Sequence, residues 1–245
     1  MTATFERATV DSGSMPPSTS QVNRAGKVLR DWWLSPLQVY GPKEDAAFIL
    51  LLEYRAAHAM PLIKANNGLR SMLKTEGLPI EVSQRLKRVA TMVDKLGREP
   101  TMALSRMQDI GGCRAIVQSI DDLRAVQQRL MKNRPPVRVA DYIVSPRSSG
   151  YRAVHVVVTY DGRCIEVQLR TQLMHEWAVA VERLGGQMDE DLKSGRGPRE
   201  VLEWLETVSQ AMEMEDAGKT VDTELMQRIS RLRAEALPFT SRRPR

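Results

Sequence analysis

Two acidic residues stand in apolar stretches where a carboxylate needs a partner. Asp109 comes just before Gly111, Gly112 and a β-rich run, and Glu166 alternates with aliphatic residues inside the run 164–169. Burying an unpaired carboxylate is costly, and two carboxylates at one site commonly hold Mg²⁺ together with substrate phosphates. An arginine follows each acid four or five positions later. The pattern predicts a metal-dependent site for a phosphorylated substrate, and two structural ion pairs are the alternative.

A group of cations precedes Asp109 in the sequence. The apolar spacing of residues 81–97 predicts a helix on which Arg85, Arg88 and Lys95 share one face, while Lys87 points away from it. A face of this kind could cradle a polyphosphate. A solvated helix face would carry the same charges, so both interpretations stay open.

The segment 141–155 predicts a strand, a turn and a second strand. Arg147 and several hydroxyl groups lie in the turn, and Tyr151 and His155 would share one face of the strand that follows. Because nucleobases stack on aromatic side chains, Tyr151 beside a basic turn predicts a base platform. A half-buried sheet tyrosine and a hydrogen-bonded sheet histidine are the simpler alternatives.

The elements that position these residues indicate an α+β fold. Helices are predicted over residues 21–33, 43–74, 81–97, 121–132, 171–184, 198–214 and 221–237, with Ser20 as the first N-cap and a kink at Pro61. Strands are predicted over 113–117, 137–144, 151–160 and 163–169, and Asp161-Gly162 predicts a two-residue hairpin turn. The result is a mixed β-sheet of about five strands flanked by helices, with helical N- and C-terminal extensions.

The length of 245 residues and the hydrophobic fraction of 42% allow one catalytic body with extensions. Residues 1–18, rich in Ser, Thr and Pro without periodicity, predict a disordered lead-in. Residues 19–214 form the expected catalytic domain with its N-terminal helices, and residues 215–245 form a C-terminal helix and a basic tail.

Charge and cysteine content narrow the class of protein. A formal net charge of +6 suits a polyphosphate or nucleic-acid substrate but is also common in proteins that bind neither. Cys113 and Cys164 lie in strand-like runs without metal-ligand spacing, so they are expected to be reduced core residues. No apolar run approaches the roughly 20 residues of a spanning helix, which predicts a cytoplasmic protein without a membrane partner.

Four ordered blocks in residues 80–185 resemble the synthetase domain of the RelA/SpoT family. They are Arg85-x-Lys87 with Lys95-Leu96, then Asp109-Ile110-x-Gly112-x-Arg114, then Asp141-Tyr142-Ile143-x-x-Pro146-x-x-x-Gly150-Tyr151-Arg152-x-x-His155, and finally Glu166-Val167-Gln168-Leu169-Arg170-Thr171 with His175 and Trp177-Ala178. The resemblance implies a nucleotidyltransferase-like synthetase fold. It also implies an enzyme that moves the β,γ-pyrophosphate of ATP to the 3′ hydroxyl of GDP or GTP, making the alarmones ppGpp and pppGpp of the stringent response.

The same resemblance assigns roles on the donor side of the reaction. Arg85 and Arg114 would sandwich the adenine of ATP, and Lys87 and Lys95 would hold its phosphates. The role of Lys87 conflicts with its predicted place on the far side of a helix, unless adenine and triphosphate lie on either side of that helix.

On the catalytic and acceptor side, the resemblance implies that Asp109 and Glu166 hold Mg²⁺. Glu166 would complete this metal site or take the proton of the attacking 3′ hydroxyl. Tyr151 would stack on the acceptor base, with Arg147 and His155 near the acceptor phosphates.

Three departures from the usual family pattern leave the acceptor open. Ala140 stands where a basic residue is frequent, Arg147 where lysine is usual, and Ser149 where asparagine is frequent. The alternatives are a toxin-type member that pyrophosphorylates the 3′ CCA end of tRNA and has an antitoxin partner, a member that accepts adenine nucleotides, and a non-catalytic nucleotide-binding module. Short members of the family are often oligomers, so a homo-oligomer is a further expectation.

Overall fold

The computed structural model describes residues 17–240 of the chain. Most of the predicted lead-in, residues 1–16, lies outside the described residues, as do Arg242, Arg243 and Arg245 of the predicted basic tail.

A five-stranded mixed sheet forms the centre of the molecule, as the sequence predicted. The strands are β1 Glu81–Leu86, β2 Gly111–Val117, β3 Arg138–Asp141, β4 Val154–Tyr160 and β5 Arg163–Thr171, in the order β1-β2-β5-β4-β3. Central β5 pairs parallel with β2 and antiparallel with β4, and both outer pairs are antiparallel. The predicted Asp161-Gly162 turn is confirmed: both residues have positive φ and join β4 to β5.

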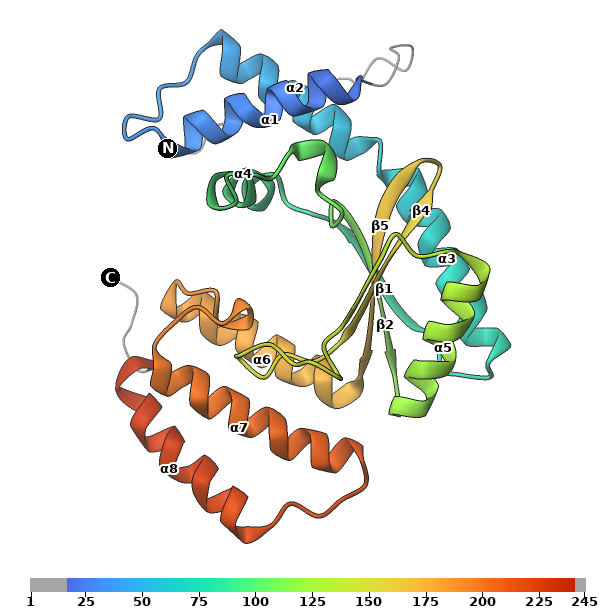
Figure 1. Ribbon diagram of the computed structural model, residues 1–245, viewed down its shortest axis with the longest axis vertical. Coiled ribbons are helices and arrows are strands. Elements are labelled where there is room, and N and C mark those ends of the chain that lie inside the picture. Colours follow the sequence, from blue (N-terminus) through green and yellow to red (C-terminus); the bar gives the residue numbers. More distant parts are fainter. Residues whose placement is uncertain (1–16, 241–245) are drawn as a thin grey trace.

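Helices surround this sheet on three sides (Figure 1). They are α1 Thr19–Leu34, α2 Pro42–Ala56, α3 Ala59–Thr75, α4 Val89–Arg98, α5 Ile120–Asn133, α6 Gln172–Met188, α7 Arg199–Asp216 and α8 Thr223–Thr240, with 3₁₀ turns η1 Leu104–Arg106 and η2 Leu192–Ser194. Helices α3 and α5 cover one face of the sheet, while α1, α2 and α4 gather at one end and α6, α7 and α8 at the other (Figure 1). The second face of the sheet lines a pocket between these two groups.

The prediction of a single helix over residues 81–97 was wrong, because the segment divides into β1 and α4. Val82 and Leu86 pack against the core under α3. A separation of four residues suits a strand of period two as well as a helix of period 3.6, so the apolar spacing could not tell them apart. Residues 81–86 form a strand because they pair with β2.

Four other boundaries differ from the predictions. Ser18, not Ser20, caps α1 through a capping box with Gln21. The predicted helix over residues 43–74 breaks at Ala57 and His58 rather than kinking at Pro61, which lies in the first turn of α3, where proline costs no hydrogen bond. Strand β4 begins at Val154, three residues after Tyr151, and β3 ends at Asp141.

Helix α6 continues through Gly185 and Gly186, which were predicted to end it. It stops at Met188, where Asp189 takes a left-handed conformation and Glu190 donates its backbone N–H to the Gly185 carbonyl. Packing of α6 against η2 and α7 outweighs the weak helix propensity of the two glycines.

Both cysteines are free thiols. Cys113 is buried in the core, and burial raises its pKa to about 12, whereas Cys164 is only half-buried. The expectation of a core position therefore holds for Cys113 alone.

The stretch Pro42–Thr75 is long and apolar enough to cross a membrane, although no such stretch was expected from the sequence. A core helix meets the same limits, so this is weak evidence for a membrane segment. In the structure Ala57 and His58 interrupt the stretch, and α3 packs against β1 and β2.

Candidate active site

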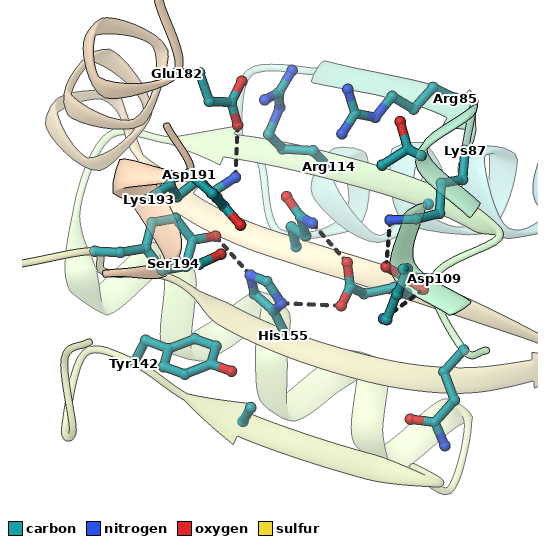
Figure 2. Close-up of a pocket in the computed structure, with 18 of the residues that line it drawn as sticks. Arg85, Lys87, Asp109, Arg114, Tyr142, His155, Glu182, Asp191, Lys193 and Ser194 are labelled. Atoms are coloured by element: carbon teal, nitrogen blue, oxygen red, sulfur yellow. Dashed lines mark hydrogen bonds and ion pairs between the residues drawn. The ribbon is translucent and has the colours of Figure 1, made fainter. Parts of the chain in front are cut away.

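A pocket of about 630 Å³ lies over the second face of the sheet. Its walls come from β1 and α4 at one end and from the β3 strand, α6 and η2 at the other, with β2, β5 and β4 as the floor. Figure 2 shows Lys87 and Asp109 at the first end and Tyr142, Lys193 and Ser194 at the second. The pocket collects all nine residues to which the sequence assigned a role: Arg85, Lys87, Lys95, Asp109, Arg114, Arg147, Tyr151, His155 and Glu166.

Strand register sets the order of side chains across this floor. Two rows cross the sheet from β1 to β3: Arg85–Gly112–Glu166–Val157–Arg138 and Ser83–Arg114–Gln168–His155–Ala140. Because alternate residues of a strand share a face, both rows reach the pocket. Gly112 carries no side chain, so the floor beside Glu166 stays open.

Asp109 lies just before β2 and binds two lysines. Its carboxylate accepts hydrogen bonds from Lys87 Nζ at 2.8 Å and from Lys95 Nζ at 3.2 Å (Figure 2). Burial by itself raises the pKa of Asp109, but the two ammonium groups outweigh burial and leave the pKa below its ordinary value. The conflict over Lys87 disappears, because this residue follows strand β1 and is not part of a helix.

Arg85 and Arg114 project from neighbouring strands at the same end of the pocket. Arg85 is exposed, and the guanidinium of Arg114 donates to Ser83 Oγ at 3.3 Å. Two guanidinium planes on adjacent strands can flank a planar base. The predicted adenine sandwich is compatible with this placement and stays a prediction.

Glu166 lies in the middle of the pocket floor and is held at both oxygens. His155 Nδ1 lies 3.1 Å from Oε1, and Gln168 Nε2 donates to Oε2 at 2.7 Å. Burial raises the pKa of Glu166, but hydrogen bonds from His155 and Gln168, together with the charge of Lys95, lower it to about 2. The carboxylate is therefore ionised at neutral pH, and His155 Nδ1 carries the proton between them.

Arg147 and Lys193 cover the tyrosines at the other end of the pocket. Arg147 lies 4.7 Å from the ring centroid of Tyr142 and 5.3 Å from that of Tyr151, and Lys193 Nζ lies 4.9 Å from that of Tyr151. Tyr151 is completely buried. A base could stack on its ring only after one of these cations moves, so the predicted platform stays a prediction.

Other pocket residues had no assigned role in the sequence prediction. Gln168 and Arg170 follow Glu166 at intervals of two residues, so alternation along a strand could have identified them. Lys193 binds Glu182 at 2.7 Å (Figure 2), and burial together with Arg170 lowers the pKa of Lys193. No sequence signal connects these two, because η2 reaches α6 only through the fold.

The carboxylates suit a hard metal ion that shares its ligands with a substrate. Among residues 17–240 no group of three or more His, Cys, Asp and Glu could hold a metal by itself. Asp109 and Glu166 face the same pocket and are close enough for Glu166 to raise the pKa of Asp109. Mg²⁺ is usually bound through one or two carboxylates, waters and substrate phosphates, and this donor set fits it.

Comparison with known proteins decides the family. A family model described as "Region found in RelA / SpoT proteins" matches residues 84–183. The GTP pyrophosphokinase YjbM of Bacillus subtilis is 33% identical over 176 residues, which cover 66% of this chain and 81% of that protein. The chain belongs to the RelA/SpoT family. The RelA/SpoT match begins in β1 and ends in α6, so every residue with a predicted role lies inside it.

Solved structures agree with this assignment. Small alarmone synthetase 1 of Bacillus subtilis bound to its product pppGpp superimposes with a TM-score of 0.55 at 28% identity, covering 74% of this chain and 93% of that one. The same protein in another crystal structure gives a TM-score of 0.57 at 29% identity, covering 80% and 100%. The predicted RelA/SpoT membership and the synthetase fold are thereby confirmed.

Proposed function

We propose that this chain is an ATP-dependent pyrophosphokinase that makes ppGpp and pppGpp from GDP and GTP. The observation that carries the proposal is the position of Glu166, an ionised carboxylate between a lysine- and arginine-lined end of one pocket and an aromatic end. The names of the relatives support it, because one is a GTP pyrophosphokinase and another is a synthetase crystallised with pppGpp as its product.

The donor nucleotide would occupy the end formed by β1 and α4. Arg85 and Arg114 would flank adenine, and Lys87 and Lys95 would turn from Asp109 to the phosphates of ATP. Each lysine offers several donors on a flexible stem, so it can change partners without movement of the backbone. Asp109 would then be free to serve as a metal ligand.

Mg²⁺ held by Asp109 and Glu166 would neutralise negative charge on the transferred phosphates. The protein's own side chains supply the rest of the stabilisation. Lysine and arginine side chains stabilise the charge that builds as the group is transferred, and the pocket keeps the two nucleotides in line.

The acceptor would bind at the end formed by β4, α6 and η2. Its 3′ oxygen attacks the β-phosphorus of ATP, a new O–P bond forms, the bond between the α-phosphate oxygen and the β-phosphorus breaks, and AMP leaves. Glu166 accepts the proton of the attacking hydroxyl, because an alcohol is a poor nucleophile without a nearby base. Arg147, Tyr151 and His155 would orient the acceptor.

The experiment that tests the function is a transfer assay with several acceptors. Purified protein receives ATP labelled in its terminal phosphates, Mg²⁺, and GDP, GTP, GMP, ATP or tRNA, and the products are separated. We expect label in GDP and GTP, and none with the Glu166→Gln variant. Label in tRNA alone would establish the toxin-type alternative, and label in no acceptor would reject the enzymatic proposal.

The tRNA-modifying alternative is not carried forward, because the relatives named above act on guanine nucleotides. The antitoxin partner belongs to that alternative alone, whereas cytoplasmic location and a homo-oligomer stay predictions from the sequence.

A further inference from the structure

Glu166 is one member of a closed ring of five hydrogen-bonded side chains. Arg170 Nη2 donates to Tyr151 Oη at 2.9 Å and to Gln168 Oε1 at 2.9 Å. Tyr151 Oη lies 2.7 Å from His155 Nε2, and His155 and Gln168 both contact the carboxylate of Glu166. The ring therefore starts at Arg170, divides into a Gln168 arm and a Tyr151–His155 arm, and closes on the two oxygens of Glu166.

The stability of the fold does not explain why an arginine occupies position 170. Its side chain is 1% exposed, yet no ion pair to an acid holds it within residues 17–240, and its Nε and Nη1 have no hydrogen-bond partner there. Burying a guanidinium without an ion pair costs free energy, which is offset here by two hydrogen bonds and by the position of the guanidinium over the Tyr151 ring, 5.3 Å from its centroid. A neutral side chain of similar size would fill the same space at lower cost.

The chemistry of arginine gives the ring a direction. A guanidinium has donors and no acceptor, so Gln168 must turn its carbonyl oxygen toward Arg170 and its NH₂ toward Glu166. The hydroxyl of Tyr151 likewise accepts from Arg170 and points its own proton at His155 Nε2. His155 then carries its proton on Nδ1 and donates to Glu166, so both arms end as donors to the carboxylate.

We propose that Arg170 is a positioning residue that fixes the orientation of the Glu166 carboxylate through the two arms of this ring. Hydrogen bonds to both oxygens hold the carboxylate against rotation while Glu166 lines the pocket. This inference rests on the proposed pyrophosphate transfer, in which Glu166 receives the proton of the attacking hydroxyl. Arg170 itself touches neither nucleotide in this role.

The kinetic test compares Arg170→Met with Arg170→Lys. Methionine keeps much of the volume and removes every donor, so we expect kcat to fall about 10- to 100-fold, the usual effect of losing a supporting hydrogen bond around a site, while KM for ATP changes little. Lysine retains a donor-only head group and should restore part of kcat. Arg163→Met is the matched control, since Arg163 lies on the same strand, packs over the Tyr54 ring at 4.9 Å and does not line the pocket.

A double-mutant cycle separates positioning from loss of packing. Tyr151→Phe removes the hydroxyl of one arm and keeps the ring. In the Arg170→Met background this second change should lower kcat little further, because the arm has already lost its donor. Independent, additive losses would contradict a shared hydrogen-bond ring.

The tautomer of His155 provides a readout that does not depend on activity. Nitrogen NMR of the imidazole should show the Nδ1–H form in the wild-type protein, a mixture of tautomers in Arg170→Met, and a smaller loss of the Nδ1–H form in Arg170→Lys. If Arg170→Met does not fold, Arg170→Lys answers both tests. Wild-type kcat and an unchanged tautomer in the folded variants would overturn the role of Arg170, whereas an inactive wild-type protein with the expected tautomer change would instead reject the proposed function.

Discussion

At the β1–α4 end of the pocket, Lys87 and Lys95 share one carboxylate and Arg85 stays exposed, whereas at the β4–α6 end Tyr151 and Arg170 are buried and joined by hydrogen bonds. At the first end both lysines are paired with Asp109, and in the proposed function they would exchange it for phosphate oxygens. At the second end, hydrogen bonds join Tyr151, His155, Glu166 and Gln168 to Arg170 in one ring, although Nε and Nη1 of Arg170 have no partner among residues 17–240. Binding a charged tail needs the first arrangement, and aiming a single carboxylate needs the second.

The largest effect is expected from Glu166→Gln, which changes the residue that lies between the two ends of the pocket. An amide cannot accept the proton as a carboxylate does, so kcat should fall by about 10²- to 10⁴-fold, the usual contribution of a general base. Labelled-ATP turnover measures the effect. Glu176→Gln, on the exposed side of α6, is the matched control. Turnover close to wild type in folded Glu166→Gln protein would contradict the assignment.

A pair of variants should separate the two ends by substrate. Lys95→Met removes a cation from the donor end and Arg147→Met removes one from the acceptor end. A hydrogen bond to a charged group contributes about 1.5–3 kcal/mol, so each change should raise one KM by about tenfold or more. We expect Lys95→Met to raise KM for ATP and Arg147→Met to raise KM for GTP. If both variants raise the same KM, the division of the pocket is wrong.

A pair of glycines compares the packing of the two ends. A Cβ at Gly97 in α4 would overlap the ring of Trp33, whereas a Cβ at Gly186 in α6 would meet nothing within 4 Å. Gly97→Ala should lower the free energy of unfolding by about 1–3 kcal/mol through overpacking. Gly186→Ala should raise it by up to about 1 kcal/mol through helix propensity. Chemical denaturation measures both, and equal effects would show that α4 can shift away from α1.

The smallest expected effect is a pH dependence of stability at the junction of α2 and α3. His58 is 1% exposed, and its Nδ1 lies 2.9 Å from the Tyr54 carbonyl. Burial lowers its pKa below the ordinary 6.5, the hydrogen bond to Tyr54 opposes this, and Arg163 of β5 lowers the pKa further. The unfolded chain therefore binds the proton more readily than the folded one. Stability is complete above pH 6.5 and falls as the pH drops from there toward the folded pKa.

For this single group the slope is at most about 1.4 kcal/mol per pH unit. Denaturation of the wild type and of His58→Gln, at about pH 7.5 and then stepwise to about pH 5, measures it. The variant should lose the part of the slope that lies just below the ordinary histidine pKa. Parallel curves would show that other groups cause the pH dependence.

Several elements could be predicted because their signals are local. Asp161-Gly162 carries its own backbone preference, and β5 alternates apolar and polar residues from Ile165 to Arg170. Asp109 and Glu166 were predicted to be site residues because burying an unpaired carboxylate in an apolar stretch is costly. Strand β1 was missed because its two core residues are spaced as in a helix, and pairing with β2 made the choice.

The hydrogen-bonded ring could not be predicted, since its members meet only through register. Tyr151 comes from the segment before β4, and His155 reaches β5 because it pairs with Gln168. Arg170 was visible as part of a motif, but its burial without an acid is a property of the folded chain. Likewise, the cover that Lys193 forms over Tyr151 depends on the path of η2 back to α6.

The parallel pairing of β2 with β5 has a consequence for synthesis of the protein on the ribosome. These central strands are separated in the sequence by α5, β3 and β4, so they can pair only after all three have been made. Non-local strand pairing is slow compared with helix formation. A nascent chain that has emerged as far as β4 would carry the donor-side cations and Asp109 but no Glu166. The growing polypeptide would therefore lack the proposed transfer activity until β5 leaves the exit tunnel and pairs with β2 and β4.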